Sequence, residues 1–454
     1  MTLWGGRFED GPGGVLWDYT TDPSDRRLLL DDIDGSIAHV TMLGQTSTIA
    51  PDEAEEVLSG LHRLRGLAIA GDFEFLDGDE DVHSAVERAL AEQIGPLAGK
   101  LHTGRSRNDQ SALDLRLYLK RSAAGRIDQL RSFARGLADL AESHAEVVVP
   151  TYTHLQQAQA GTLGHHLLAY AWMALRSAER FGDVMDRVDV SPLGAGASAG
   201  TSLAIDPQQS ARLLGMERVF ANSLDAVGSR DHVAEYVFCC AQAMVDLSRL
   251  AEEVVLWASV EFGWARLDDR VSTGSSALPH KRNPDIAELV RGRAARVAGD
   301  LMAILTLQKG LPLAYNRDFQ EDKRLAFDAD DVLAASLPAM AELLEHTVFE
   351  PPPPEASVMS LDLAEALVQR GVPFREAHRA VGNLFLALDE AGREISAIGL
   401  DDLTAAHGSF EEADLDLLDV ESAMSRPRSP GAGDSESVRT QIAAIRSQLP
   451  PAQG

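Results

Sequence analysis

The chain has 454 residues, 45% of them apolar and 24% charged, a globular composition that argues against disorder through most of the chain. Length alone predicts about two to four domains. With 41 basic and 70 acidic residues the formal net charge is −29, which repels nucleic-acid phosphates and anionic lipid headgroups and excludes both as partners.

The basic residues are 36 arginines and only five lysines. A surface this acidic is suited to concentrated salt. We therefore expect the protein to come from a halophilic microbe, and we do not expect the acidic surface to bind a basic partner. Cys239 and Cys240 are the only cysteines, which excludes a disulfide framework, and no zinc pattern is present. The start, MTLWGGRFED, lacks a signal-peptide pattern, and no run of 18 uncharged apolar residues occurs. We therefore expect a soluble, cytoplasmic protein with no membrane contact.

Apolar residues recur at helical spacing through most of the chain. An amphipathic helix is predicted within residues 110–149, and a second helix over residues 151–189. A long helix starting at Asp231 has apolar residues on more than one face, which predicts burial on several sides and packing into a bundle. Asn283 and Pro284 can cap and begin a further helix. Strand signals are few, so the predicted fold class is all-α.

Two breaks divide the chain into three predicted domains. A polar, turn-rich stretch near Gly104 precedes the long helices, and FEPPPPEA at residues 349–356 cannot continue a helix. The predicted domains are an N-terminal helical domain at 1–104, a long-helix bundle at 105–355 and a small helical domain at 356–454. The segment SRPRSPGAGDSES, residues 425–437, is predicted to be an exposed loop.

Polar, glycine-marked segments interrupt the helices and carry residues that bind carboxylates. In HTGRSRNDQ, residues 102–110, Arg105 and Arg107 can hold carboxylates through paired donors, while Ser106 and Asn108 add a hydroxyl and an amide. A capped loop with solvated arginines explains this segment equally well.

Two histidines have similarly open interpretations. Thr153 and His154 in PTYTHLQ follow a proline turn at the head of a predicted helix, where the histidine could relay a proton or only cap the helix. His83 in EDVHSAVERAL is either charged beside carboxylates or an ordinary surface residue.

The segment STGSSALPHKRNPD, residues 272–285, combines a flexible glycine–serine loop with Lys281 and the predicted helix start at Asn283, an arrangement that attracts an anion. It lacks the Walker phosphate-loop pattern, and a plain linker would not need a lysine, two serines and a capped helix together. A fourth segment, LPLAYNRDFQEDKR at residues 311–324, offers the phenol of Tyr315, the amide of Gln320 and the ammonium of Lys323.

Taken together these segments resemble a known family. GSSALPHKRNP resembles the signature loop of the fumarase/aspartase superfamily, with Leu278 in place of a methionine, a swap that conserves volume and apolarity. LWGGRF, HTGRSRNDQ, THLQ and YNRDFQEDK resemble the argininosuccinate lyase family, which includes the delta-crystallins. TTDPSDRRL resembles a family segment that usually has serine where Thr21 stands.

The resemblance implies an all-α, three-domain chain whose long helices form a twenty-helix bundle in a homotetramer, with active sites shared between subunits. It implies reversible cleavage of argininosuccinate to arginine and fumarate, the last step of arginine biosynthesis, with no metal or organic cofactor. The catalytic roles implied are Ser275 as base, Lys281 and Asn283 as stabilisers of the aci-carboxylate intermediate, His154 as acid or relay, Glu288 as its charge partner, and Thr153 lining the site. The substrate-binding residues implied are Thr21, Asp25, His83, Arg105, Ser106, Asn108, Arg230, Tyr315, Gln320 and Lys323.

Two alternatives remain at this point. The first is another lyase of the superfamily, such as adenylosuccinate lyase or aspartase, because the signature loop alone indicates only that fumarate is eliminated. The second is a structural protein like the inactive delta-crystallins. The presence of Ser275, His154, Lys281 and Glu288 together favours an active enzyme.

Overall fold

The computed structural model describes residues 13–426 and 429–449, so the LWGGRF motif at residues 3–8 lies outside the described residues. Helices dominate, as the sequence predicts, and the described chain contains three two-stranded sheets. No helix in the described ranges is long and apolar enough to cross a bilayer. Cys239 and Cys240 are free and buried, in agreement with the expected lack of a disulfide framework.

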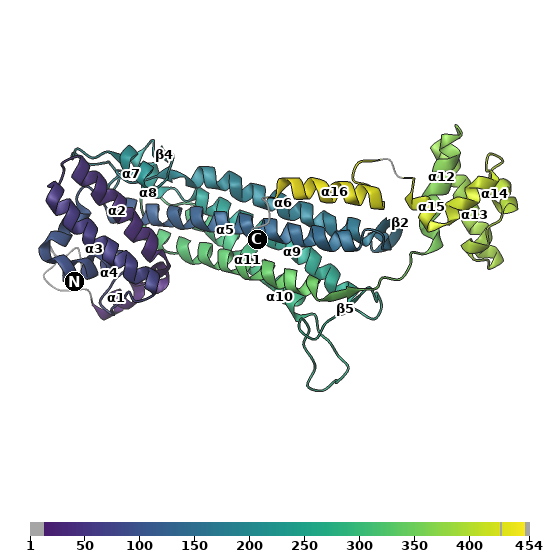
Figure 1. Ribbon diagram of the computed structural model, residues 1–454, viewed down its shortest axis with the longest axis horizontal. Coiled ribbons are helices and arrows are strands. Elements are labelled where there is room, and N and C mark those ends of the chain that lie inside the picture. Colours follow the sequence, from purple (N-terminus) through teal and green to yellow (C-terminus); the bar gives the residue numbers. More distant parts are fainter. Residues whose placement is uncertain (1–12, 427–428, 450–454) are drawn as a thin grey trace. The chain divides into compact units, whose positions relative to one another are not determined.

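Five long helices make up the middle of the chain (Figure 1). They are α5 (Arg107–Ser143), α6 (Leu163–Val188), α9 (Asp231–Trp257), α10 (Asp285–Gln308) and α11 (Asp322–Glu345). The chain divides into two compact units whose boundaries fall within these helices. Those boundaries do not test the three predicted domains, which stay a prediction, and each unit is described by itself.

The first unit contains residues 1–128, 177–244 and 293–335. Its shorter elements are α1 (Gly14–Thr20), η1 (Pro23–Leu28), α2 (Leu29–Gln45), α3 (Pro51–Ala70), α4 (Val82–Ile94), η2 (Gly95–His102), β3 (Val190–Ser191), α7 (Pro207–Leu213), β4 (Arg218–Val219), α8 (Ser223–Gly228) and η3 (Arg317–Gln320). Helices α2, α3 and α4 lie side by side (Figure 1). They bury a core that includes Ile33, Leu43, Leu61 and Leu90. Burial of such side chains contributes about 1.5–3 kcal/mol each.

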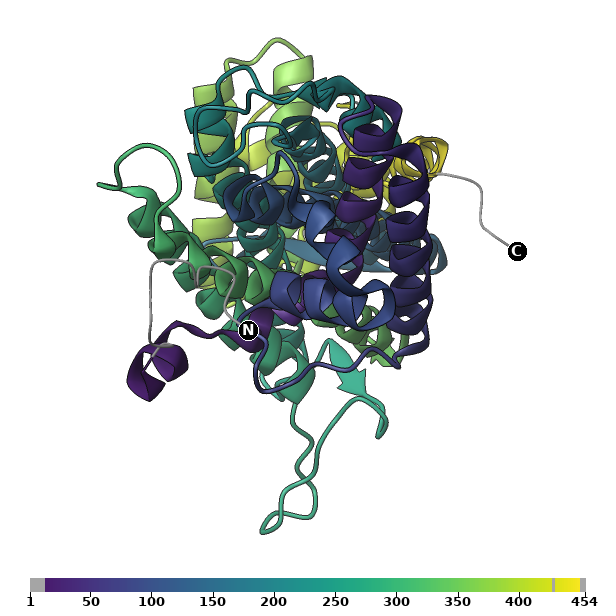
Figure 2. The same ribbon diagram turned by 90° about the vertical axis from the view of Figure 1, so that its left-hand side faces the viewer.

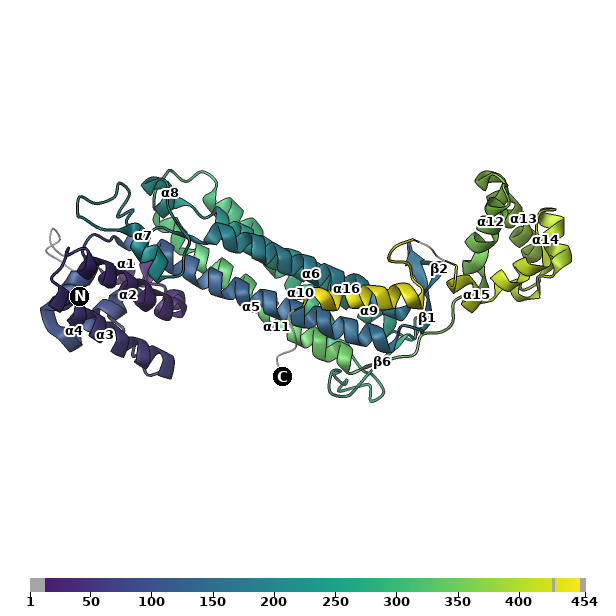
Figure 3. The same cartoon turned by 45° about the horizontal axis from the view of Figure 1, so that its top comes forward.

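The second unit contains residues 129–176, 245–292 and 336–454. Its shorter elements are β1 (Val148–Thr153), β2 (Gln156–Thr162), β5 (Ala265–Leu267), β6 (Thr347–Phe349), η4 (Ala356–Met359), α12 (Ser360–Gln369), α13 (Phe374–Ala391), η5 (Ile395–Ala397), α14 (Leu400–Ala406), η6 (Glu412–Leu418), α15 (Val420–Met424) and α16 (Ser435–Gln448). Helices α12, α13 and α14 stand together in Figure 3 and have their own apolar core.

One prediction about the elements needs correction. Residues 151–162 are not helical: β1 and β2 form an antiparallel hairpin, and the helix begins only at Leu163. The helix formers Gln and Ala in this segment suggested a helix, but cross-strand pairing overrides such weak propensities. The loop predicted at residues 425–437 agrees with the described residues up to Asp434, and its last three residues, from Ser435, belong to α16.

Other element predictions agree with the structure. Helix α10 begins at Asp285, within two residues of the predicted start, and Pro284 accepts its first backbone hydrogen bond from Glu288 at 3.0 Å. The four prolines after Phe349 form an irregular connection between β6 and η4. In α9, buried residues such as Val237 and Cys240 alternate with half-exposed Phe238 and Val245, so burial on several sides is only partial within the chain.

Candidate active site

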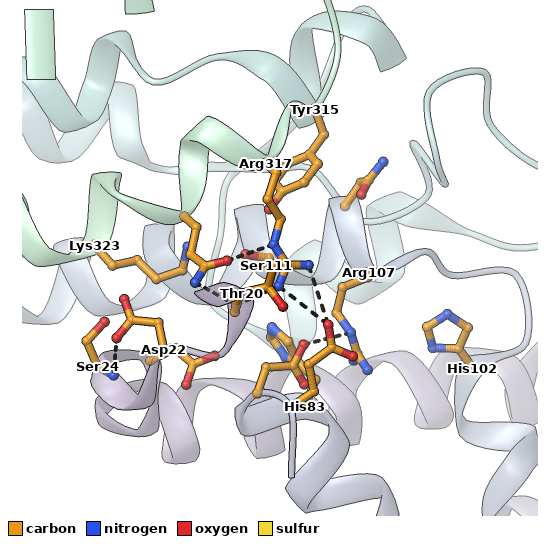
Figure 4. Close-up of a pocket in the computed structure, with 15 residues that line it drawn as sticks. Thr20, Asp22, Ser24, His83, His102, Arg107, Ser111, Tyr315, Arg317 and Lys323 are labelled. Carbon is orange, nitrogen blue, oxygen red and sulfur yellow. Dashed lines mark hydrogen bonds and ion pairs between the residues drawn. The ribbon is translucent and has the colours of Figure 1, made fainter. Parts of the chain in front are cut away.

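A cavity of about 310 Å³ lies in the first unit where four distant chain segments meet (Figure 4). Its size is near the lower end for small-molecule sites. Six residues predicted from the sequence line it: Asp25, His83, Asn108, Tyr315, Gln320 and Lys323. The fold therefore brings together side chains that lie up to about 300 residues apart in the chain.

The acidic side of the cavity is built by η1 and the start of α4. Asp81 caps α4 by accepting a hydrogen bond from the Ser84 N–H at 2.7 Å, which leaves the Val82 N–H at the free end of the helix. That N–H donates to the Asp25 carboxylate at 3.2 Å. The capping arrangement thus fixes Asp25 and His83, the next residue of α4, at one wall of the cavity.

The second wall is the start of α5, where a reciprocal cap fixes the backbone. The Ser106 N–H donates to the Asp109 carboxylate at 2.8 Å, and the Ser106 hydroxyl accepts from the Asn108 N–H at 3.2 Å. Asp109 also accepts from the Gly194 and Gly196 N–H groups. This anchoring directs Arg107 and Asn108 toward the cavity.

The third wall comes from residues 315–323. Arg317 and Gln320 both donate to the Thr20 carbonyl oxygen, at 2.8 and 3.0 Å, and so tie this segment to the end of α1. Lys323 donates to the Asp322 carboxylate at 3.1 Å, and Arg230 also pairs with Asp322. Although burial opposes it, these two cations lower the pKa of Asp322.

The cavity carries both signs of charge, an arrangement that suits a zwitterionic ligand. Burial raises the pKa of Asp25 to about 6, and the charge of Asp81 adds to this shift, while His83 and Lys323 oppose it. Burial also acts to raise the pKa of Asp81, but His83 and Arg107 outweigh it and lower the value. Such perturbed carboxyl groups in a concave site are typical of functional positions.

Four predicted binding residues do not line this cavity. Thr21 follows Thr20, which does line it, and the Thr21 hydroxyl is buried without a partner among the described residues. Arg105 is 6% exposed and donates to the Ser36 hydroxyl at 3.0 Å. Ser106 acts as the helix cap, and Arg230 pairs with Asp322, the carboxylate that also accepts from Lys323.

Nine further lining residues were not singled out as binding residues from the sequence. They are Thr20, Asp22, Ser24, Glu80, Asp81, His102, Arg107, Ser111 and Arg317. Of these, Arg107 is a possible carboxylate ligand on the sequence alone, although the family resemblance does not imply a binding role for it. Arg317 and Asp81 lie close in sequence to other predicted binding residues. Their charge and their position beside those residues were the sequence features that could have identified them as lining residues.

The loop with the predicted base lies in the second unit. It connects β5 to α10 and projects as an open loop in Figure 2. Thr273 and Asn283 pair across its neck through backbone hydrogen bonds of 3.3 and 2.9 Å. The Ser275 hydroxyl accepts from the Ala277 and Leu278 N–H groups at 3.3 and 3.1 Å. Lys281 is exposed, as is Glu288 in the first turn of α10.

Thr153 and His154 also lie in the second unit, at the tip of the β1–β2 hairpin. Thr153 pairs with Gln156, so His154 and Leu155 form a two-residue turn in which both have positive φ, 56° and 57°. This conformation disfavours residues with a Cβ atom and costs each about 1–2 kcal/mol. All four of these turn residues are exposed, and His154 stands at a strained position of the kind found at functional sites.

Comparison with known proteins agrees with the motifs. A family model described as lyase matches residues 7–299, and one described as argininosuccinate lyase C-terminal matches residues 358–425. The chain is 44% identical to argininosuccinate lyase of Carboxydothermus hydrogenoformans, over 99% of this chain and 100% of that protein. It is 45% identical to argininosuccinate lyase of Moorella thermoacetica, over 99% and 98% of the two chains.

A solved structure of EDDS lyase in complex with formate has a similar fold. The TM-score is 0.82 at 29% identity, and the match covers 95% of this chain and 88% of that one. A structure of 3-carboxy-cis,cis-muconate lactonizing enzyme from Pseudomonas putida matches with a TM-score of 0.72 at 20% identity, covering 96% and 99%, and so supports the fold alone. With full-length matches to curated relatives and both family models in order, the chain belongs to the argininosuccinate lyase family.

Proposed function

We propose that this protein catalyses the reversible cleavage of argininosuccinate to arginine and fumarate, the last step of arginine biosynthesis. The observation that carries the proposal is the cavity, because residues from separate family motifs line it together with both acidic and basic groups. Arg107, Tyr315, Gln320 and Lys323 can bind carboxylates, while Asp25 and Glu80 can bind cationic groups of the substrate.

The chemical difficulty is removal of a proton from the carbon next to a carboxylate, because this adds negative charge to an anion. In the proposed mechanism the Ser275 alkoxide takes that proton, and Lys281 and Asn283 stabilise the resulting aci-carboxylate. The carbon–nitrogen bond then breaks, its electron pair goes to the guanidino nitrogen, and His154, paired with Glu288, supplies the proton to that nitrogen. Fumarate and arginine leave.

One local contact supports Ser275 as the base. Its hydroxyl oxygen already accepts two backbone N–H groups, from Ala277 and Leu278. Hydrogen bonds to the charged form of a group favour that form, so these donors would help stabilise a serine alkoxide. Ser276 has no hydrogen bond through its side chain among the described contacts, which makes it a matched comparison residue.

The proposed assembly is a homotetramer with active sites shared between subunits. Lys281, Glu288, Thr153 and His154 are exposed in the single chain, which fits residues that complete a site only after association. Helices α9 and α10 also leave large apolar side chains open to solvent: Phe238, Val245, Leu289, Met302 and Leu305. Such apolar surfaces are typical of protein interfaces. We further propose adaptation to high salt, on the basis of the acidic composition, and a cytoplasmic location, which suits the proposed biosynthetic reaction.

The test is fumarate release from argininosuccinate, followed by ultraviolet absorbance in buffers from low salt to molar potassium chloride. We expect turnover by the wild type, a drop in kcat of about 10²–10⁴-fold for Ser275→Ala, and near-normal turnover for Ser276→Ala. Gel filtration and thermal unfolding check that both variants keep the assembly.

Each other outcome has a definite meaning. Turnover of adenylosuccinate or aspartate in place of argininosuccinate would assign the chain to another reaction of the superfamily. A folded protein that turns over none of these substrates in any salt would support a structural role. Normal activity of Ser275→Ala would remove Ser275 as the base.

A further inference from the structure

A buried cluster of three titratable side chains lies behind the cavity. His83 of α4 is 3% exposed, and its Nδ1 atom lies 3.0 Å from Asp32 Oδ1 and 3.3 Å from Asp114 Oδ2. Asp32 comes from α2 and Asp114 from α5, and both are almost completely buried. Three helices thus converge on one imidazole nitrogen, which the predicted mechanism does not use.

The two aspartates have different surroundings. Asp32 accepts a hydrogen bond from the Gln110 amide in addition to its contact with His83. Neither carboxyl oxygen of Asp114 has a hydrogen-bond partner among the described residues. A buried carboxylate without donors is costly, because burial disfavours its charged form. We therefore assign the negative charge to the Asp32 carboxylate and treat Asp114 as a neutral carboxylic acid.

The pKa directions agree with this assignment. Although burial acts to raise it, the pKa of Asp32 is lowered to about 2 by His83, Arg105 and Gln110. Burial and the neighbouring charges of Asp32 and Asp31 raise the pKa of Asp114 well above its usual range.

The other edge of the His83 ring faces the cavity. His83 is one of the lining residues, and Figure 4 shows it at the cavity wall below Arg317. Because Nδ1 is directed at the aspartates, Nε2 is the ring nitrogen left for a ligand; it has no hydrogen-bond partner in the described part of the chain and is not fully enclosed. With Nδ1–H donated to a carboxylate, a neutral imidazole would leave Nε2 as an acceptor, and only the imidazolium leaves it as an N–H donor, so the charge of the ring decides what it can bind.

We propose that Asp32 is a positioning residue that holds His83 as an imidazolium, so that its Nε2–H binds a carboxylate of the substrate, while Asp114 is a neutral neighbour. The inference rests on the proposed function for the identity of the substrate. An opposite charge at hydrogen-bond distance stabilises the imidazolium form, and a charge-assisted hydrogen bond is about twice as strong as a neutral one.

The decisive comparison is Asp32→Asn against Asp114→Asn. An amide resembles a neutral carboxylic acid in size, so Asp114→Asn should leave KM and kcat within about threefold of wild type. Asp32→Asn removes the charge at hydrogen-bond distance from the ring, while the more weakly coupled charges of Asp25 and Asp81 remain. It should raise the KM for argininosuccinate about 10- to 100-fold with a smaller change in kcat, since ground-state binding is lost. Equal effects of the two substitutions would overturn the assignment.

A double-mutant cycle tests whether Asp32 acts through His83. His83→Gln should raise KM as Asp32→Asn does, and the double variant should be no worse than His83→Gln alone. Additive losses would show that Asp32 acts independently, and unchanged KM in a folded Asp32→Asn protein would also contradict the proposal. Thermal unfolding of each variant identifies losses that come from misfolding.

A measurement without substrate separates this inference from the proposed function. Solid-state ¹⁵N NMR of histidine-labelled protein at pH 7.5 should show an imidazolium signal that is absent in His83→Gln and becomes a neutral imidazole in Asp32→Asn. A neutral His83 in the wild type would overturn the proposal even if fumarate is released. Loss of activity on dialysis against a chelator, restored by a divalent metal, would also contradict the proposal.

Discussion

At the scale of single residues, the pKa of Asp25 has a consequence for stability. It is raised to about 6 in the folded chain, against 3.8 for an unperturbed carboxyl. The folded state therefore binds this proton more tightly than the unfolded state, and the contribution of Asp25 to stability falls as pH rises from about 4 through 6. At neutral pH the buried, charged Asp25 carboxylate destabilises the fold.

We predict that Asp25→Asn stabilises the protein at pH 7.5 by on the order of 2 kcal/mol and has little effect at pH 4. Urea unfolding midpoints at the two pH values measure the difference. The matched control is Asp22→Asn, because Arg324 and Ser24 outweigh burial and lower the pKa of Asp22. Asp22→Asn should be less stable than wild type at pH 7.5. A destabilised Asp25→Asn protein at pH 7.5 would contradict the prediction.

The segments that form the site could be predicted from the sequence. The side chains of those segments that face the cavity were predicted less well. HTGRSRNDQ contributes to the cavity, but Arg107 lines it while Arg105 is enclosed. Two arginines separated by one residue at a helix start point in different directions, and the choice depends on tertiary packing. The Asp109 carboxylate that fixes this backbone is held by glycines about 85 residues further along the chain. No local pattern contains that information.

At the scale of elements, the loop that carries Tyr315 lies against the end of α8. A Cβ atom added at Gly228 would lie 2.8 Å from the Ala314 carbonyl oxygen and 3.0 Å from its nitrogen. Ala314 itself has a positive φ of 66°, so the loop backbone has little freedom to move away. Close approach of the two backbones at Gly228 therefore sets the position of Tyr315 in the cavity.

Gly228→Ala should destabilise the protein by about 1–3 kcal/mol and raise KM, because the loop must shift and carry Tyr315 with it. Thermal unfolding and steady-state kinetics measure the two effects. Gly66→Ala is the control: Gly66 is exposed within α3 and has no atom near the added Cβ, so alanine should stabilise by about 0.5–1 kcal/mol. Unchanged KM in Gly228→Ala would show that the loop position does not depend on this contact.

Helices of strong periodicity could be predicted, and the hairpin could not. The residues QQAQAGT have good helix propensity for most of their length, and the paired strand VVPTYT is short. The turn between them needs two residues with positive φ, yet it contains histidine and leucine instead of the asparagine and glycine that usually mark such turns. Because the turn lacks asparagine and glycine, the sequence around His154 contains no pattern that would predict a hairpin there.

At the scale of the whole molecule, the sequence predicts an all-α chain and its family, and both are confirmed. The length of the central helices follows from proline-free runs and apolar spacing. The partition into units does not follow from the sequence, because compactness depends on how segments 100 or more residues apart pack together. The polyproline connection marks a break in helix, but the long helices pass through the boundaries between the units without any break.

The net charge of −29 leads to a prediction about salt. Repulsion between exposed carboxylates opposes the compact state, and the Debye length shortens from about 10 Å at 0.1 M to about 3 Å at 1 M salt. We therefore expect the Tm to rise between 0.1 and 1 M potassium chloride. A variant with four exposed acids changed to lysine should show a smaller rise, because each exchange replaces one negative charge with one positive charge and so changes the net charge by two. The acids chosen are Glu55, Glu56, Asp72 and Asp77, which lie outside the cavity. If the salt dependence of Tm is the same in both proteins, self-repulsion is not its cause, and the acidic surface would then need an explanation other than adaptation to salt.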